Sequence, residues 1–284
     1  MSSANASRRT VLTGLTGLAT VSAAAGLGIV TPAAPARAGT DASARPDRGE
    51  RPTVVLVHGA FADASGWNRA VRHLQHDGFP VVAVANPLRT LTGDAAYLTA
   101  VLASITGPII LVGHSYGGAV ITNAATGIPN VKALVYVAAF APDQGETALA
   151  LSAGGALQDA VAGVPVPAPG GGTEVELSIR PQEFRKVFIS EVDPTTALAM
   201  AATQRPITLT ALGSPSGPPA WRSIPSWYAV SGADRAIPPA SQRAMARRAA
   251  SRTVEVADAS HAHFVTHPHV VVDLVRGAAR ATAR

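Results

Sequence analysis

The stretch IILVGHSYGG, residues 109–118, places a serine at the centre of a Gly-x-Ser-x-Gly pattern. An aliphatic run, Ile109–Gly113, precedes Ser115, and a helix is expected at 116–125. Small residues around a serine allow a tight, strained turn that lifts its hydroxyl above the edge of a sheet. The first N–H groups of the following helix then face any negative charge that develops there. The segment therefore predicts a strand, a turn carrying a nucleophile and a helix, in that order.

Similar short apolar runs recur along the chain and alternate with helical segments. Continuous rather than alternating apolar runs are typical of parallel strands that are buried on both faces. We therefore predict an α/β fold, a doubly wound and mostly parallel sheet of about six strands. The expected strands are 53–58, 81–84, 109–113, 133–138, 226–230 and 253–256, and the expected helices are 67–77, 92–104, 116–125, 239–250 and 268–279.

Residues 142–220 interrupt this alternation. They contain a run rich in proline and glycine, GVPVPAPGGG at 163–172, followed by two expected helices at 181–190 and 194–203. About eighty residues between two strands far exceeds the usual connection of about 4–6 residues. We expect a helical cap inserted after the fourth strand, over the strand ends that carry the chemistry. The alternative is a surface insertion without a role.

Two motifs, HGAFADASGW at 58–67 and GHSYGG at 113–118, resemble the α/β-hydrolase superfamily over residues 53–284. Within it they are similar to small bacterial esterases related to the plant methylesterase and hydroxynitrile lyase group. The resemblance implies a six-strand core and the chain order nucleophile, acid, base. Serine at the turn argues against dehalogenase and epoxide hydrolase relatives, which carry aspartate there. Lyase relatives carry lysine directly after the catalytic histidine, where this chain has Ala262.

The resemblance places the catalytic base in the loop after the last strand. His261 lies there, seven residues before Pro268, as the family pattern requires. His263 is the alternative base. A serine hydroxyl is a poor nucleophile unless a base accepts its proton, so Ser115 and His261 are expected to act together.

The acid that orients the base is expected after the penultimate strand. Asp234, in SGADRAIP at 231–238, occupies that position. Asp143, after the fourth strand, is the alternative, because some relatives carry the acid there. Asp258 lies only three residues before His261 and is expected to be solvated.

The backbone N–H groups of Ala60 and Tyr116 are expected to form the oxyanion hole. Phe61, Tyr116 and Trp227 are predicted to contact substrate, although the Tyr116 ring could equally be structural. The clustered histidines at 261–269 could suggest a metal site, but their spacing and the interrupting proline argue against one. We therefore expect neither a metal nor another cofactor.

The N-terminus is predicted to be an export signal. Arg8 and Arg9 form a twin-arginine pattern, an uncharged run spans 10–36, and Ala36-Arg37-Ala38 is typical of a cleavage site. We predict a Tat-type signal peptide at 1–38, a linker at 39–52 and a hydrolase domain at 53–284. A retained membrane anchor is the alternative; after cleavage we expect no membrane association.

Composition narrows the function further. The 284 residues are 47% hydrophobic, which suffices for a large core, and they include no cysteine, which excludes disulfides and thiolate catalysis. The net charge of +5 falls to +2 without the three arginines of 1–38, which is too little for nucleic-acid binding. We predict a secreted serine hydrolase of small-molecule esters or lactones, monomeric or weakly dimeric. The alternatives are a perhydrolase or lyase-type member, or a non-catalytic binding protein of the same fold.

Overall fold

The computed structural model describes residues 51–168 and 170–283. The predicted signal peptide, and residues 39–50 of the predicted linker, lie outside the described residues. Within the described ranges, no helix has both the length and the apolar character needed to span a membrane.

A six-stranded sheet forms the centre of the molecule, and all five of its strand pairings are parallel. The strand order is β2-β1-β3-β4-β8-β9, so the direction of progress across the sheet reverses between β1 and β3. The loops that follow these two strands meet where the direction reverses, which is where open α/β sheets bind ligands. The strands are β1 (Thr53–Val57), β2 (Val81–Val84), β3 (Ile109–His114), β4 (Val131–Val137), β8 (Ser226–Ser231) and β9 (Arg252–Val256).

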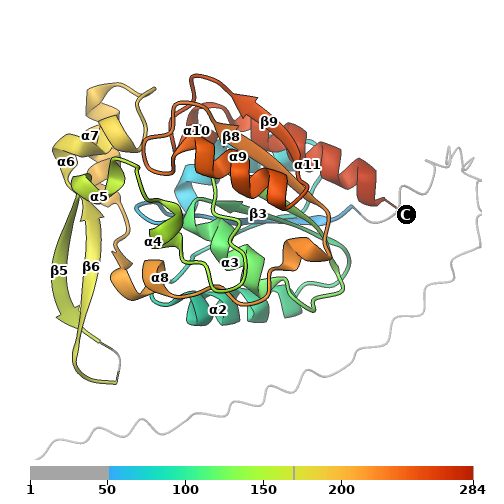
Figure 1. Cartoon of the computed structure of the whole chain (residues 1–284). Coiled ribbons are helices and arrows are strands. Elements are labelled where there is room, and N and C mark those ends of the chain that lie inside the picture. Colours follow the sequence, from blue (N-terminus) through green and yellow to red (C-terminus); the bar gives the residue numbers. More distant parts are fainter. Residues whose placement is uncertain (1–50, 169, 284) are drawn as a thin grey trace, which may run out of the picture. The chain divides into compact units, whose positions relative to one another are not determined.

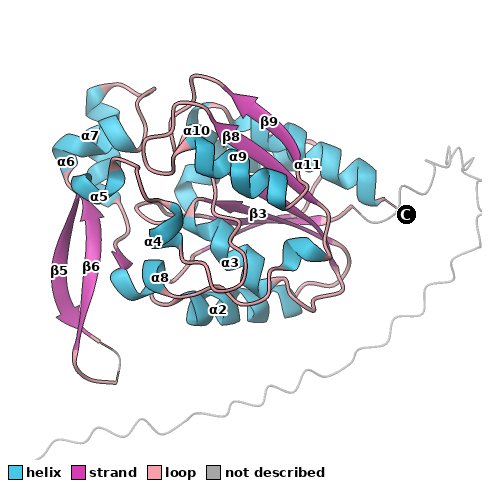
Figure 2. Cartoon of the chain, viewed as in Figure 1, coloured by secondary structure: helices cyan, strands magenta, loops and turns pink. Residues whose placement is uncertain are grey.

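Helices cover both faces of this sheet (Figures 1 and 2). Because parallel crossovers are right-handed, the reversal at β1 puts α1 on one face and α2, α3 and α9 on the other. The C-terminal helix α11 packs against α1. The helices are α1 (Asn68–His76), α2 (Leu91–Ala103), α3 (Tyr116–Ala124), α9 (Pro239–Arg248) and α11 (Pro268–Thr282), with short turns at η1 (Ala64–Trp67) and α10 (His263–Thr266).

Burial explains why the strands read as continuous apolar runs. Every residue of β3 and of β8 is buried, since helices cover both sides of each strand. The outermost strand β9 is mostly exposed and correspondingly polar, with the sequence RTVEV. The prediction of an α/β fold with a mostly parallel sheet of about six strands is confirmed.

The insertion between β4 and β8 contains strands as well as helices, which corrects the expectation of a purely helical cap. A three-stranded sheet has the order β5-β6-β7 with antiparallel pairing, and its β5–β6 hairpin projects away from the main sheet (Figure 1). The elements of this cap are α4 (Ala148–Leu151), α5 (Leu157–Ala160), β5 (Val161–Pro167), β6 (Thr173–Ile179), α6 (Pro181–Val187), α7 (Pro194–Thr203), β7 (Ile207–Thr208), α8 (Leu209–Gly213) and η2 (Ala220–Arg222).

Candidate active site

Ser115 lies in a strained turn between β3 and α3. Its φ of 52° and ψ of −125° are rare for a residue with a side chain, and such strain concentrates at functional sites. The surrounding glycines are required by close contacts. A Cβ on Gly117 would lie 2.4 Å from the Val57 carbonyl oxygen, and one on Gly59 would lie 2.6 Å from the Cβ of Ser115. The turn therefore packs directly against the loop that follows β1.

A continuous hydrogen-bonded chain links Ser115, His261 and Asp234. The Nε2 atom of His261 lies 2.8 Å from the Ser115 Oγ, and its Nδ1 lies 2.7 Å from the Asp234 Oδ2. The histidine side chain is 2% exposed and the aspartate side chain is fully buried. This geometry favours the tautomer with the proton on Nδ1, which leaves Nε2 free to accept the serine proton.

Backbone and side-chain donors hold the carboxylate of Asp234. Its Oδ1 accepts from the backbone N–H groups of Ala236 and Ile237 at 2.7 and 2.9 Å. Its Oδ2 accepts from the Gln242 amide at 2.7 Å, beside the histidine contact. Gln242 is fully buried on α9, and its oxygen also accepts from the Ser231 N–H. The position and orientation of the carboxylate are thus fixed by the loop after β8 and by α9.

Two backbone N–H groups are free to hold an oxyanion. Those of Ala60 and Tyr116 donate to no acceptor within the part of the chain that the structure describes. Tyr116 is the first residue of α3, so its N–H lacks an intrahelical partner. The loop carrying Ala60 is held by His58, which donates from Nδ1 to the Gly59 carbonyl and accepts at Nε2 from the Asn86 N–H. Burial lowers the pKa of His58, which keeps this neutral arrangement.

His114, which directly precedes Ser115 in the sequence, holds the backbone of His261 in place. Its Nε2 donates to the backbone carbonyl of His261 at 3.1 Å. The His114 side chain is fully buried, and this burial holds its pKa well below the ordinary value, so it stays neutral. Sequence reasoning missed two contacts, that of His114 and that of Gln242. His114 and His261 lie 147 residues apart in the chain, and Gln242 faces Asp234 only once α9 has packed against the loop after β8.

The sequence matches the alpha/beta hydrolase family over residues 54–274, which is most of the chain. The chain belongs to the alpha/beta hydrolase family. It is 36% identical over 113 residues to a carbendazim hydrolyzing esterase of Nocardioides sp. (strain SG-4G), a match covering 34% of this chain and 46% of that esterase. It is 25% identical over 250 residues to the alpha/beta hydrolase nvfD of Aspergillus novofumigatus (strain IBT 16806), covering 81% of this chain and 97% of nvfD.

The fold also resembles that of a methylesterase protein from Arabidopsis. The TM-score is 0.67 with 18% sequence identity, and the match covers 81% of this chain and 99% of the methylesterase. At this identity the likeness shows a shared fold only. Of the two curated relatives, the Nocardioides protein is an esterase, and nvfD is described only as an alpha/beta hydrolase.

The other acids and histidines of this hydrolase have different roles. His263 is buried, and its Nδ1 contacts the Ser231 Oγ at 2.7 Å. Asp143 forms an ion pair with Arg222, and Asp258 is exposed. In the described part of the chain, none of the three is hydrogen-bonded to the Ser115 hydroxyl, whose partner is His261. No group of three or more potential metal ligands occurs among the described residues.

The structure brings only part of the predicted substrate contacts to the site. The Tyr116 ring points away, because its hydroxyl donates to the buried Asp94 at 2.8 Å. Trp227 is a correction. It lies near the amino end of β8, beneath the Arg252 guanidinium and beside Gly277 of α11, whereas the triad lies at the carboxyl ends of the strands. Phe61 does lie beside the site, where its ring is in edge contact with the Phe188 ring and the two ring centroids are 6.4 Å apart.

A small pocket of about 60 Å³ lies near the triad, although none of the three triad residues lines it. Its walls come from the loop after β1, from α7 and from α10, and they include Phe61, Phe188, Met200 and Phe264. Phe188 connects the pocket to the triad, because its ring lies 5.3 Å from that of His261. Polar residues complete the lining, so the pocket offers a small group both apolar and polar contacts; they are Asp63, Ser65, Thr203 and Gln204.

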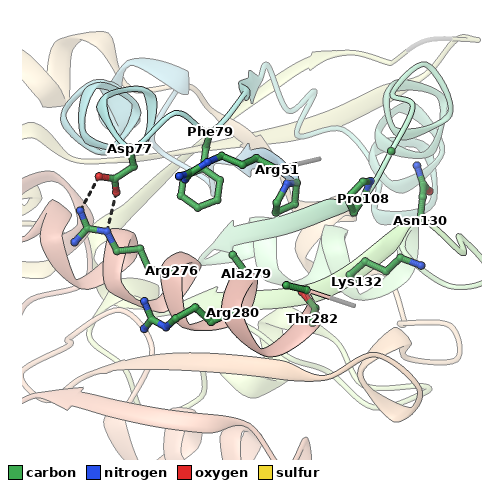
Figure 3. Close-up of a pocket in the computed structure, with 13 residues that line it drawn as sticks. Arg51, Asp77, Phe79, Pro108, Asn130, Lys132, Arg276, Ala279, Arg280 and Thr282 are labelled. Atoms are coloured by element: carbon green, nitrogen blue, oxygen red, sulfur yellow. Dashed lines mark hydrogen bonds and ion pairs between the residues drawn. The ribbon is translucent and has the colours of Figure 1, made fainter. Parts of the chain in front are cut away.

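A larger groove, of about 1020 Å³, lies elsewhere (Figure 3). It includes Pro52, Pro108 and Asn130, which precede β1, β3 and β4, so it opens at the amino ends of the strands. Arg276 projects from α11 into it and pairs with Asp77. Because Ser115, His261 and Asp234 lie at the carboxyl ends of the strands, this groove is separate from them.

Proposed function

We propose that this chain is a serine hydrolase that cleaves carboxylic esters or lactones through an acyl-enzyme. The observation that carries the proposal is the buried chain from Ser115 through His261 to Asp234, with contacts of 2.8 and 2.7 Å. Nucleophile, base and orienting acid within hydrogen-bond reach are what acyl transfer requires. The esterase relative from Nocardioides supports the choice of ester substrates.

In the proposed cycle, the Ser115 Oγ attacks the substrate carbonyl carbon while the Nε2 of His261 takes the hydroxyl proton. The carbonyl oxygen becomes an oxyanion held by the N–H groups of Ala60 and Tyr116. As the intermediate collapses, the carbon–oxygen ester bond breaks and His261 gives the proton to the leaving alcohol. Water, deprotonated by His261, then attacks the carbonyl carbon of the acyl-enzyme. The bond to the Ser115 Oγ breaks, which releases the acid and restores the serine.

The lining of the pocket near the triad favours small, mainly apolar substrate groups. Its walls combine aromatic and aliphatic side chains with a smaller number of polar ones, and its volume of about 60 Å³ is well below that of a drug-sized site. We therefore expect short acyl chains to be preferred over long ones.

The test is to assay the purified full chain on p-nitrophenyl esters with acyl chains of two, four, eight and twelve carbons. The wild type is expected to turn over the two shortest esters fastest. Ser115→Ala is expected to lose roughly a thousandfold or more in kcat, the scale seen when a catalytic nucleophile is removed. Ser226→Ala is the matched control, because Ser226 is as buried as Ser115 but lies at the opposite end of the sheet.

A fluorophosphonate probe separates a wrong substrate from a wrong mechanism, because it labels only activated serines. Labelling of the wild type and of Ser226→Ala, but not of Ser115→Ala, would support the mechanism even if every test ester were poor. A Ser115→Ala variant that keeps wild-type turnover would refute it.

We further propose that residues 1–38 direct export through the Tat route, with cleavage after Ala38. The support is the sequence pattern of Arg8 and Arg9, the uncharged run and the small-residue site. Residues 1–38 fused to a folded reporter should carry it out of the cytoplasm, and Arg8→Lys with Arg9→Lys should strongly reduce that export. Unchanged export of the double variant would exclude the twin-arginine route.

A further inference from the structure

The loop that carries His261 is bonded on both sides of the histidine to one segment of the cap. This segment, Phe188–Glu191, follows α6. After the histidine, the Ala262 N–H donates to the Phe188 carbonyl at 2.8 Å. Before it, the Ser260 N–H donates to the Glu191 Oε1 at 2.7 Å. The residues directly before and after His261 therefore both donate a hydrogen bond to the cap segment.

Glu191 satisfies both donors of Ser260. While one carboxylate oxygen accepts from the amide N–H, the other accepts from the hydroxyl. The Ser260 Oγ in turn accepts from the Ser190 N–H at 3.2 Å, so the hydroxyl closes a ring of contacts with the cap segment. Ser260 is 4% exposed. Without this carboxylate the Ser260 N–H has no acceptor among the described residues and the hydroxyl keeps only the Phe188 carbonyl, at 3.5 Å. A buried N–H without an acceptor is costly, so removing the carboxylate should displace the loop.

Aromatic packing supports the same connection. The Phe188 ring lies in edge contact with the His261 ring at 5.3 Å and with the His114 ring at 6.2 Å. Phe184 of α6 lies behind it at 4.9 Å. The cap segment thus contacts the imidazole through the Phe188 ring. It contacts the peptide groups on either side of the histidine through the Glu191 carboxylate and the Phe188 carbonyl.

We propose that Glu191 is a positioning residue for the catalytic base, so that docking of the segment Phe188–Glu191 on the histidine loop is required for a competent triad. The proposal rests on the proposed serine-hydrolase function. It assigns the cap a part in the chemistry itself, besides covering the site. A shift of about 1 Å in the imidazole is enough to slow proton transfer roughly a hundredfold.

The test compares Glu191→Ala and Glu191→Gln with the wild type in the full chain. Active-site concentration is set by fluorophosphonate titration, and kcat and KM are measured on p-nitrophenyl acetate across a range of pH. Glu191→Ala should lower kcat and the labelling rate roughly ten- to hundredfold with KM changed less than about threefold, because the base is displaced while the pocket stays. Glu191→Gln keeps one acceptor for the Ser260 N–H and should recover part of this loss.

Asp193→Ala is the matched control, because it removes a cap carboxylate two residues further on. Asp193 accepts from the Thr196 N–H at the start of α7 and does not contact the histidine loop. The control should keep wild-type kcat even where it loses thermal stability. If Glu191→Ala keeps wild-type kcat and labelling rate, or if Asp193→Ala loses as much, the positioning role is wrong.

Failure of the proposed function would look different. A wild type that neither hydrolyses the ester nor takes the probe refutes both proposals. A wild type that depends on Ser115 but is indifferent to Glu191 refutes only the positioning role. If Glu191→Ala does not fold, Glu191→Gln decides: an unchanged kcat in that folded variant, without loss of labelling rate, counts against the proposal.

Discussion

Asp234 can orient His261 only as precisely as its own carboxylate is held, and Gln242 supplies the donor closest to that contact. We expect Gln242→Ala to lower kcat about tenfold, by loosening the carboxylate. Its three lost hydrogen bonds should also lower the free energy of unfolding by about 2–4 kcal/mol. Urea denaturation and steady-state kinetics measure the two effects.

Asn123→Ala provides the comparison for Gln242→Ala. Asn123 is also an amide with three hydrogen bonds, to Ala119, Ser216 and Gly217, but it lies further along α3 than the nucleophile turn. It should lose stability while keeping kcat. Equal losses of kcat in both variants would mean that Gln242 acts only through the fold.

Sequence could predict the individual residues whose position in the chain is fixed by a motif. Ser115 is placed by its turn, and His261 and Asp234 by the loops after the last two strands, and the structure brings these three side chains within hydrogen-bond distance; their catalytic roles stay a prediction. Gln242 and Glu191 could not be predicted, because nothing in their neighbours distinguishes them until the fold brings them to Asp234 and Ser260. Trp227 was misplaced because the prediction did not use the expected strand 226–230, which already put this residue at the amino end, opposite the triad.

Among the elements, helix α7 supplies the wall of the small pocket that is best suited to change. Met200 lies on α7 and lines the pocket. Met200→Ala should enlarge the pocket and shift the preference of kcat/KM from acetyl toward butyryl or octanoyl esters by about 3–10-fold, since each methylene in an apolar pocket counts. An unchanged ratio across the ester series would place the acyl group elsewhere.

The cap shows which elements local sequence can predict and which depend on pairing. Helices α6 and α7 begin at proline and were predicted near their observed bounds. Strand β5 was missed because Pro165 and Pro167 argue against a strand, yet β5 is an edge strand, where proline is tolerated. The alternation in TEVELSI, residues 173–179, was a usable signal for β6.

For the molecule as a whole, buried histidines couple stability to pH. Burial lowers the pKa of His263 to about 4, against an ordinary value of 6.5, and it also lowers the pKa values of His58 and His114. The groups facing His263 are His267, His261, Asp234 and Glu191. The two acids raise its pKa and the two histidines lower it, but burial is the largest influence.

The sign of the effect follows from these directions. Between pH 6.5 and pH 4 the unfolded chain binds a proton that folded His263 does not, so the stabilisation is complete above 6.5 and is lost as pH falls toward 4. From His263 alone the free energy of unfolding should drop by about 3 kcal/mol between pH 7 and pH 4. Urea denaturation at the two pH values should show a smaller drop in His263→Gln.

The exposed His269 on α11 provides the control, because His269→Gln should leave the pH dependence as in the wild type. An equal drop in His263→Gln and the wild type would show that other groups cause the acid sensitivity.

The other two buried histidines, His58 and His114, lie beside the triad. His58 holds the loop of Ala60, and His114 holds the carbonyl of His261. Because burial holds their pKa values below the ordinary 6.5, His58 and His114 should take up a proton in the folded protein only after the fold has begun to weaken, so any loss of activity from releasing the oxyanion loop and the base should follow the loss of stability.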